Sequence, residues 1–395
     1  MSSKFYHPLF RVYTFQSPTR IVFGINSLDK LQEELKKFEP KSALIVSGKN
    51  VCRTEGYAKV CSTISSVCST VEFNEVSPEP DSSTISRLAS RVREVSPSVV
   101  VGIGGGSSLD MAKAASITVA NEKDPISYFK GEPLTKKGPP VITVPTISGT
   151  GSEVTPISVV VDSGKKLALS HPFLYPSLTV VDPVLSITAP PYSTASAGID
   201  ALCHAMESFM SLDSTPITES LAFEAMSLSE EYLERAYSNG EDIEARSALS
   251  LASILAGMAF MNTGLCLAHG IAYTFATKCK LPHGVSVALA EPYVLEFNAP
   301  AITEKLGVIA AAFGIDTEGA SPAETGDAVA MRLTEIMDTM NLPLSLDELG
   351  IEEKELEPMV EDLIKNYSRF IVKNPRKPSK EDLIKLYQRM FEGYW

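Results

Sequence analysis

Two kinds of hydrophobic periodicity divide this chain. In the first half, short apolar runs typical of buried strands alternate with segments of helical periodicity, a pattern that predicts an α/β domain with a largely parallel sheet. The runs cover residues 42–47, 71–76, 98–103, 140–147, 157–162 and 178–181. From Ser193 onward the periodicity is helical. We therefore predict two domains, an α/β domain over residues 1–190 and an all-helical domain over residues 191–395.

Local patterns add a hairpin and a long helix to this outline. Residues 10–15 and 20–23 look like strands separated by a Ser-Pro turn, so we expect them to pair as a hairpin. Residues 246–274 are apolar nearly all round and predict one central, buried helix that ends near His269.

The composition is that of a soluble enzyme. A net charge of -13 argues against nucleic acid or an anionic membrane as the main partner. The six cysteines form no CxxC pair, which indicates reduced thiols rather than a disulfide framework. No signal-peptide core precedes the first strands, and the apolar run 249–259 is too short to span a bilayer. We expect a cytoplasmic protein with no membrane partner.

Three consecutive glycines join a strand to a helix. Gly104, Gly105 and Gly106 let the backbone approach a ligand closely, and Ser107 begins a helix whose N–H groups favour an anion such as a pyrophosphate. The spacing matches neither the G-x-G-x-x-G fingerprint nor a Walker loop. The alternative interpretation is a tight strand-to-helix turn.

A second loop of small and hydroxyl residues follows the next strand. Its candidate contacts to a ligand are Thr146, Ser148, Thr150 and Ser152. Two such loops at the carboxyl ends of parallel strands suit a dinucleotide. The alternative is an ordinary surface loop. The apolar residues that flank the segment argue against this interpretation.

The end of an earlier strand bears on which nicotinamide cofactor binds. An acidic residue there would hold the ribose 2′-hydroxyl of NAD. This chain has Gly48 and Lys49 instead, which leave space and a positive charge for a 2′-phosphate. We therefore expect NADP rather than NAD.

An acid and a histidine lie four residues apart in a helical segment. Asp200 and His204 share one face of that helix, and the residues around them are small and apolar. A buried polar pair of this kind needs a partner, and a divalent metal would serve. His269 and His283 complete a set of three imidazoles and one carboxylate, which suits Fe²⁺ or Zn²⁺. Any one of these histidines alone would more often be a satisfied core residue.

Several segments carry a joint signature, which is highly specific. They are Gly104-Gly105-Gly106-Ser107 with Asp110 and Lys113; Pro145-Thr146 with Gly149 to Val154; Gly198 to Ala205; Ala268-His269-Gly270; Pro282-His283-Gly284; and Asn374-Pro375-Arg376. With these motifs the chain resembles the iron-containing (group III) alcohol dehydrogenases over nearly its full length.

The resemblance implies an α/β dinucleotide-binding domain followed by an all-α domain, the fold shared with dehydroquinate synthase, with the active site in the cleft between the domains. It makes the acid and the three histidines metal ligands. It makes residues 104–107, Asp110 and the loop 146–150 contacts to the cofactor. The basic residues that we place near the cleft are Lys113, Lys165 and Lys166. Of these, we expect Lys166 to contact the cofactor as well. Members are usually dimers or larger, so a homodimer is expected.

One position departs from the family pattern. Many members have a second histidine four residues after the one that matches His269, close to the nicotinamide. This chain has Tyr273 there. A proton relay through that histidine is therefore absent, and Tyr273 either moves the proton itself or walls the pocket. Asp110 is the other candidate for moving a proton.

We hypothesise a metal-dependent, NAD(P)-linked alcohol dehydrogenase or aldehyde reductase. Fe²⁺ would act as a Lewis acid on the oxygen of a small alcohol or aldehyde while hydride passes between substrate and nicotinamide. Alternatives on the same scaffold are a lyase similar to dehydroquinate synthase and a polyol- or phosphonate-type dehydrogenase. The lyase would need several basic residues at the cleft. A non-catalytic binding protein is the third possibility. The intact set of four ligands argues against it, because a protein without catalysis would not need to keep four polar residues that are costly to bury.

Overall fold

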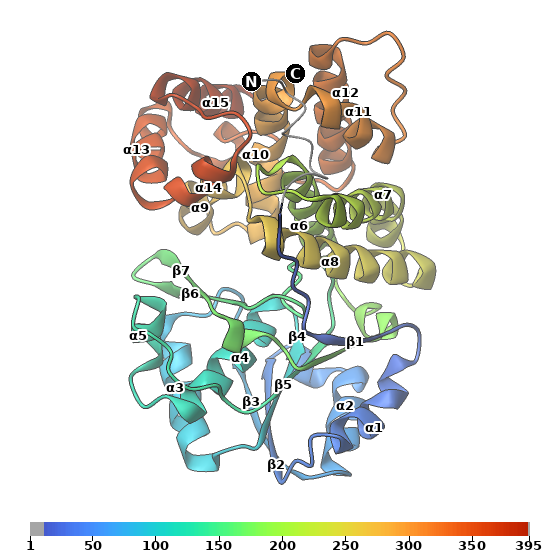
Figure 1. Cartoon of the computed structure of the whole chain (residues 1–395), viewed down its shortest axis with the longest axis vertical. Coiled ribbons are helices and arrows are strands. Elements are labelled where there is room, and N and C mark those ends of the chain that lie inside the picture. Colours follow the sequence, from blue (N-terminus) through green and yellow to red (C-terminus); the bar gives the residue numbers. More distant parts are fainter. Residues whose placement is uncertain (1–11, 394–395) are drawn as a thin grey trace. The chain divides into compact units, whose positions relative to one another are not determined.

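The computed structural model describes residues 12–393, which form two compact units (Figure 1). The sheet unit contains Ser17–Pro190 and also Gly240–Ser250. The helical unit contains the remaining described residues, most of them in Pro191–Asn239 and after Leu251. The segment 240–250 therefore belongs with the sheet although it lies within the helical half of the sequence.

A parallel sheet of six strands forms the centre of the sheet unit. Its strand order is β1-β8-β5-β4-β2-β3. All neighbouring strands are parallel. The strands are β1 (Arg20–Phe23), β2 (Ser42–Gly48), β3 (Ser69–Val76), β4 (Val99–Gly104), β5 (Val141–Pro145) and β8 (Leu178–Val181). The predicted α/β class with a parallel sheet is confirmed.

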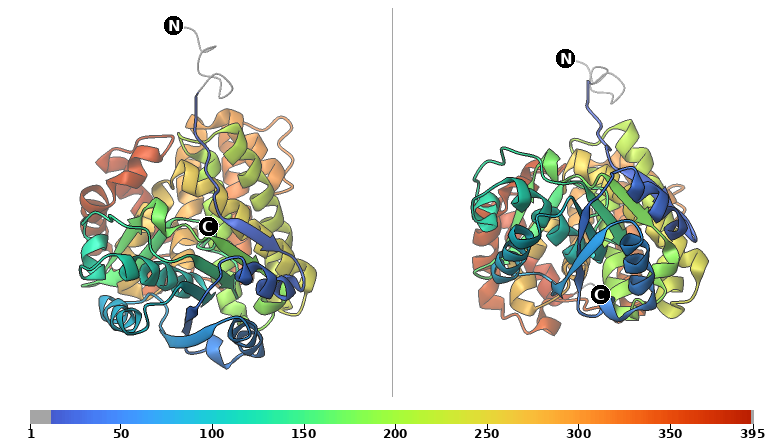
Figure 2. Two further views of the ribbon diagram at one scale, coloured as in Figure 1. Left: turned by 60° about the horizontal axis from the view of Figure 1, so that its bottom comes forward. Right: turned by 90° about the horizontal axis from the view of Figure 1, so that it is seen from below.

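Helices cover both faces of this sheet (Figure 2). They are α1 (Leu31–Lys36), α2 (Glu55–Ser65), α3 (Ser82–Val95), α4 (Gly106–Ala120) and α5 (Pro125–Phe129). Alternate residues of β2 pack into the hydrophobic cores on opposite faces of the sheet. Ala43 and Ile45 pack with α1 and α2, and Leu44 and Val46 pack with α3 and α4. Because both faces are buried, the strands appear in the sequence as continuous apolar runs rather than alternating ones.

The order of the strands creates a switch point beside β2. The chain leaves β2 for β3 at the sheet edge and then returns to place β4 on the other side of β2. The connections that follow β2 and β4 therefore lead in opposite directions. Ligands of open α/β sheets bind at the carboxyl ends of strands at such a point.

Two details of the predicted sheet are wrong. The hairpin does not form: β1 pairs in parallel with β8, and residues 12–15 are not in a strand. Residues 10 and 11 of that prediction lie outside the described residues. The predicted strand at 157–162 is β6 (Ile157–Asp162), but it pairs with β7 (Lys165–Ser170) in a separate antiparallel sheet. A two-residue turn with positive φ at Ser163 and Gly164 makes this pairing possible.

The helical unit contains ten α-helices in the described chain, counting α8, which it shares with the sheet unit. They are α6 (Pro191–Met210), α7 (Pro216–Ser238), α8 (Ile243–Thr263), α9 (Leu267–Cys279), α10 (His283–Asn298), α11 (Thr303–Ala312), α12 (Pro322–Thr339), α13 (Leu356–Asn366), α14 (Ser368–Lys373) and α15 (Lys380–Glu392). At Gly198 a Cβ would lie 2.3 Å from Leu233 Cδ1, so the glycine allows α6 and α7 to pack closely.

The single long helix predicted over residues 246–274 is wrong. Gly264, with φ of +71°, ends α8, and α9 begins three residues later. A conformation that glycine adopts without cost breaks the helix there. Among the described residues α8 alone is long and apolar enough to cross a membrane. Its buried residues Ala252, Ala256 and Ala259 identify it as a core helix.

Candidate metal centre and cofactor loops

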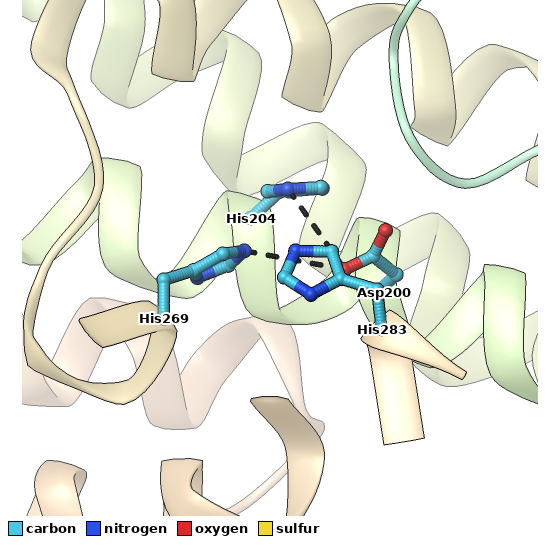
Figure 3. Close-up of side chains that lie close together, drawn as sticks. All are labelled: Asp200, His204, His269 and His283. Carbon is cyan, nitrogen blue, oxygen red and sulfur yellow. Dashed lines mark ion pairs between the residues drawn. The ribbon is translucent and has the colours of Figure 1, made fainter. Parts of the chain in front are cut away.

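Four polar side chains from three helices meet inside the helical unit. Asp200 and His204 lie in the middle of α6, His269 in the first turn of α9, and His283 is the first residue of α10 (Figure 3). One ligand atom from each lies within 4.8 Å of those of the other three. We call these four residues the metal cluster. The structure thus brings together the set that the sequence suggested.

The geometry of the metal cluster fits one divalent ion. Nε2 of His204 and Nε2 of His269 lie 3.9 and 4.0 Å from Oδ1 of Asp200. Two ligands of one ion are separated by at most twice the metal–ligand distance. For nitrogen and oxygen donors this upper limit is roughly 4–4.5 Å, and both separations lie within it. Nε2 of His269 is also buried without a hydrogen bond. A buried nitrogen without a hydrogen bond costs free energy of folding, and a metal ion bound to this atom would remove that cost.

A glycine brings the third helix close enough. Gly284 follows His283, and a Cβ at this position would lie 2.0 Å from the carbonyl oxygen of Ser196 and 2.7 Å from Cβ of Asp200. Both neighbours belong to α6. The missing side chain lets the start of α10 rest directly on α6, and this contact places His283 beside Asp200.

Glu207, one turn beyond His204 on α6, orients a ligand from behind. Its Oε2 lies 2.5 Å from Nδ1 of His269 and accepts a hydrogen bond from the backbone N–H of Cys266. Its Oε1 accepts from the backbone N–H groups of Ala268 and His269. A fully buried carboxylate thus caps the start of α9, where N–H groups lack partners within the helix, and favours His269 with its proton on Nδ1.

Aromatic rings enclose the cluster. Phe260 stacks on His204 with ring centres 4.4 Å apart, and Tyr273 stacks on His283 at 5.4 Å with an interplanar angle of 13°. Phe370 lies 5.4 Å from Tyr273, centre to centre. These contacts limit the access of water to the ligands and lower the local dielectric constant.

A second buried acid lies on α10. Glu291 is fully buried, and neither carboxyl oxygen has a hydrogen-bond partner among the described residues. Burial raises the pKa of Glu291 well above its ordinary value, and the negative charge of Glu207 acts in the same direction. The shift favours the neutral carboxyl of Glu291 up to a higher pH than for an exposed glutamate.

In the sheet unit, the two predicted loops pack against each other at the carboxyl ends of β4 and β5. Gly104 has φ of +140°, which favours glycine. A Cβ at Gly106 would lie 2.7 Å from Oγ1 of Thr150, so this glycine is needed for the loops to touch. The backbone N–H of Thr146 donates to the carbonyl oxygen of Gly104.

The start of α4 offers N–H groups to a ligand. Gly105 is its N-cap residue and supplies no capping side chain, so the first N–H groups of the helix are available for an anion. This arrangement fits a pyrophosphate at residues 104–107. The hydroxyl of Ser107 accepts a hydrogen bond from the backbone N–H of Glu79, and that of Ser148 bonds the hydroxyl of Ser250.

A buried lysine ties the second loop to α4. Nζ of Lys113 contacts Oδ1 of Asp110 at 3.3 Å and donates to the hydroxyl of Ser152 and the carbonyl oxygen of Ile157. Asp110 also accepts from the hydroxyl of Ser152 and from the backbone N–H of Val159. Burial raises the pKa of Asp110 and lowers that of Lys113, while their mutual attraction opposes both shifts. These bonds give Asp110 and Ser152 a part in holding the loop and β6 in place.

The remaining predicted cofactor residues lie at two places. Gly48 is the last residue of β2 at the switch point, and Lys49 follows it and is exposed. A Cβ at Gly48 would lie 3.0 Å from the carbonyl oxygen of Val76, so packing against β3 also favours glycine here. Lys166 lies on β7 and forms an ion pair of 2.6 Å with Glu79. Its charge is therefore already neutralised.

Sequence reasoning missed Glu207 and Glu291. Glu207 had a signal: it lies seven residues after Asp200 and three after His204, on the same face of an otherwise apolar helix segment. Glu291 had the weaker signal of a single acid in an apolar run ahead of Pro292.

Comparison with known proteins gives a consistent match. The family model of the iron-containing alcohol dehydrogenases matches residues 18–183, and the C-terminal model of the Fe-containing alcohol dehydrogenase family matches residues 194–391. The chain is 31% identical over 387 residues to choline dehydrogenase of Bacillus subtilis, with 96% of each chain covered. It is 32% identical to long-chain-alcohol dehydrogenase 1 of Geobacillus thermodenitrificans, over 95% of this chain and 98% of that protein. A solved alcohol dehydrogenase from Oenococcus oeni superposes with a TM-score of 0.91 at 31% identity, over 97% of this chain and all of the other.

Replacing Glu207 by glutamine tests its role behind His269. Glutamine offers one acceptor oxygen where the carboxylate offers two, so its NH₂ group must face buried N–H donors in either orientation. We expect affinity for Fe²⁺ or Zn²⁺ to fall by about 10–100-fold, measured by competition with a chelator. The control is Glu231→Gln, an exposed acid of α7. Equal affinity in wild type and Glu207→Gln would contradict this role.

Replacing Glu291 by glutamine tests whether its carboxyl is held neutral. With a folded-state pKa above the unfolded value, the ionisation of the acid adds no cost to folding at low pH and adds a growing cost as the pH rises from the unfolded-state pKa toward the folded-state pKa. We expect Glu291→Gln to raise the Tm relative to wild type, by more at about pH 8 than at about pH 5. Thermal unfolding followed by circular dichroism measures this, with Glu231→Gln again as control. A Tm difference that is independent of pH would refute the neutral carboxyl.

Proposed function

The chain belongs to the iron-containing alcohol dehydrogenase family, and we propose that its metal cluster holds the iron. The protein is an oxidoreductase that transfers hydride between a nicotinamide cofactor and an alcohol or aldehyde. The observation that carries the assignment of the ligands is the convergence of the acid and three histidines in a buried site with a supporting carboxylate. Three imidazoles and one carboxylate suit Fe²⁺ and also accept Zn²⁺.

The bound groups supply the reactive chemistry, and the protein positions them. When bound, the metal stabilises negative charge on the substrate oxygen as a Lewis acid, and the nicotinamide accepts or donates the hydride. Glu207 fixes the ring of His269, and Phe260 and Tyr273 limit the access of water. The sheet unit holds the dinucleotide through residues 104–107 and the loop around Thr146 and Thr150.

Oxidation of an alcohol also releases a proton, and two residues are candidates for moving it. Asp110 accepts bonds from Lys113, Ser152 and Val159, which supports a positioning role more than a relay. Tyr273 stacks on His283, which supports its role as a wall of the site.

The lyase alternative is weakened because the lysines that it would need for substrate binding are already occupied. Lys113 is fully buried and its amino group is occupied by neighbours within the sheet unit. Lys166 is paired with Glu79. Neither is available to a phosphorylated or carboxylated sugar acid.

Three finer features belong to the proposal. NADP is preferred over NAD, because the loop after β2 has the exposed Lys49 and no acid. The protein is a homodimer or larger assembly, as the family resemblance suggests. It acts in the cytoplasm on a small alcohol or aldehyde.

Replacing His269 by alanine tests the metal cluster. The variant should lose metal affinity by well over the factor of about 10–100 typical of outer-shell changes, and with it alcohol-dependent formation of NAD(P)H. Metal content and turnover are measured after anaerobic loading with Fe²⁺ and, separately, Zn²⁺. His171→Ala, a loop histidine of the sheet unit, is the control. Full turnover of His269→Ala without metal would refute the proposal.

Replacing Lys49 by alanine tests the preference for NADP. If Lys49 binds the 2′-phosphate, the KM for NADPH should rise about tenfold or more while the KM for NADH stays unchanged, because a charge-assisted contact is lost. Lys41→Ala is a matched control, since Lys41 is an exposed lysine that precedes the amino end of the same strand. Better use of NADH than NADPH by the wild type would show that the preference is wrong.

A further inference from the structure

An arginine lies close to the metal cluster, separated from it by the ring of Tyr273. Arg369 on α14 places its Cζ atom 4.6 Å from the ring centre of Phe370 and 5.9 Å from that of Tyr273. Tyr273 in turn stacks on His283, a member of the cluster, at 5.4 Å. The guanidinium therefore continues the aromatic wall that begins at the metal site.

Arg369 differs from the other arginines of the helical unit. Arg332 is paired with Glu230 and Glu234, and Arg389 with Glu296. For the exposed Arg369, the described residues provide aromatic contacts but no hydrogen bond or ion pair.

The chemistry of a stacked arginine suits an anion. Contacts with aromatic faces hold the guanidinium plane in place and leave its N–H groups free at the edge. Those N–H groups match the two oxygens of a carboxylate or a similar acidic group. Because the position is pre-organised, little conformational entropy is lost when the anion binds.

We propose that Arg369 selects substrates that carry an acidic group a few carbons from the reacting carbon. The aldehyde or alcohol end lies at the metal cluster, and the chain passes the ring of Tyr273 so that the acid meets the guanidinium. This inference rests on the proposed function, since it takes the metal cluster as the place of reaction. Tyr273 and Phe370 then position the arginine, and Arg369 determines specificity without taking part in hydride transfer.

The test compares acidic and neutral aldehydes of equal carbon number. We would measure kcat and KM of the metal-loaded enzyme with succinate semialdehyde against butanal and with glutarate semialdehyde against pentanal. The variants are Arg369→Gln, which removes the charge, and Arg369→Lys, which keeps the charge but loses the planar fork. Arg235→Gln is the matched control, because Arg235 also stacks on a tyrosine of the helical unit, Tyr232, at 4.8 Å, on α7.

The proposal expects the wild type to favour the acidic aldehyde in at least one pair by about tenfold or more in kcat/KM. Arg369→Gln should remove most of that preference through the KM of the acidic aldehyde and leave the neutral partner unchanged. Arg369→Lys should retain part of it, and Arg235→Gln all of it. High salt should weaken the preference.

Three results would overturn the proposal. The wild type could favour the neutral aldehyde in both pairs, or Arg369→Gln could change both members of a pair equally. Arg369→Gln could instead raise the KM for the nicotinamide cofactor, which would assign the arginine to cofactor binding. Each of these leaves the enzyme an active dehydrogenase. Absence of turnover with every aldehyde in fully metal-loaded wild type would refute the proposed function as well, so the two failures are distinguishable.

Discussion

The helical unit depends on keeping polar side chains inside an apolar interior. Each member of the metal cluster would be destabilising if buried alone, because a carboxylate or imidazole loses its hydration without compensation. The chain meets this cost in two ways. Glu207 satisfies Nδ1 of His269 together with the free N–H groups at the start of α9, and a metal ion can satisfy the atoms that face inward. One carboxylate therefore links the packing of α6 and α9 to the orientation of a ligand, so folding and metal binding stabilise each other.

The sheet unit has a different constraint: under the proposed function its two loops must bind an anion, and their centre holds no free basic side chain. The turn after β4 relies on backbone N–H groups, and the glycines allow the second loop to pack against it. The cation of this region, Lys113, is buried and holds Ser152 and Asp110 in place. Charge is thus used to fix the loop, and under the proposed function the backbone N–H groups remain available for the cofactor phosphates.

The amino-acid pattern was sufficient for the fold class and for the pair of Asp200 and His204, because each left a local signal. His269 and His283 joined that pair as the remaining candidate histidines and through the family resemblance. Buried parallel strands produce continuous apolar runs, and Asp200 and His204 share a helix face. The errors concern features that local sequence does not determine. Residues 20–23 suit a hairpin or a parallel edge strand equally well, and only the partner β8, distant in sequence, decides between them. The break at Gly264 was hidden because glycine is tolerated within apolar helices. Glu207 was overlooked because a single acid on a helix usually faces solvent, and its burial depends on where α9 begins.

The distribution of these constraints indicates where substrate specificity can vary within the site. A change at His269 or Glu207 disturbs a buried network that also caps a helix, so such changes cost stability as well as activity. Tyr273 and Arg369 are held mainly by ring contacts at the outer side of the cluster, where Arg369 is exposed. Replacing an exposed side chain leaves no buried group without a partner, so the energetic cost is small. If the metal cluster is the place of reaction, as proposed, hydride transfer depends on the core of the helical unit, whereas residues of α9 and α14 such as Tyr273 and Arg369 can change with little cost to the fold.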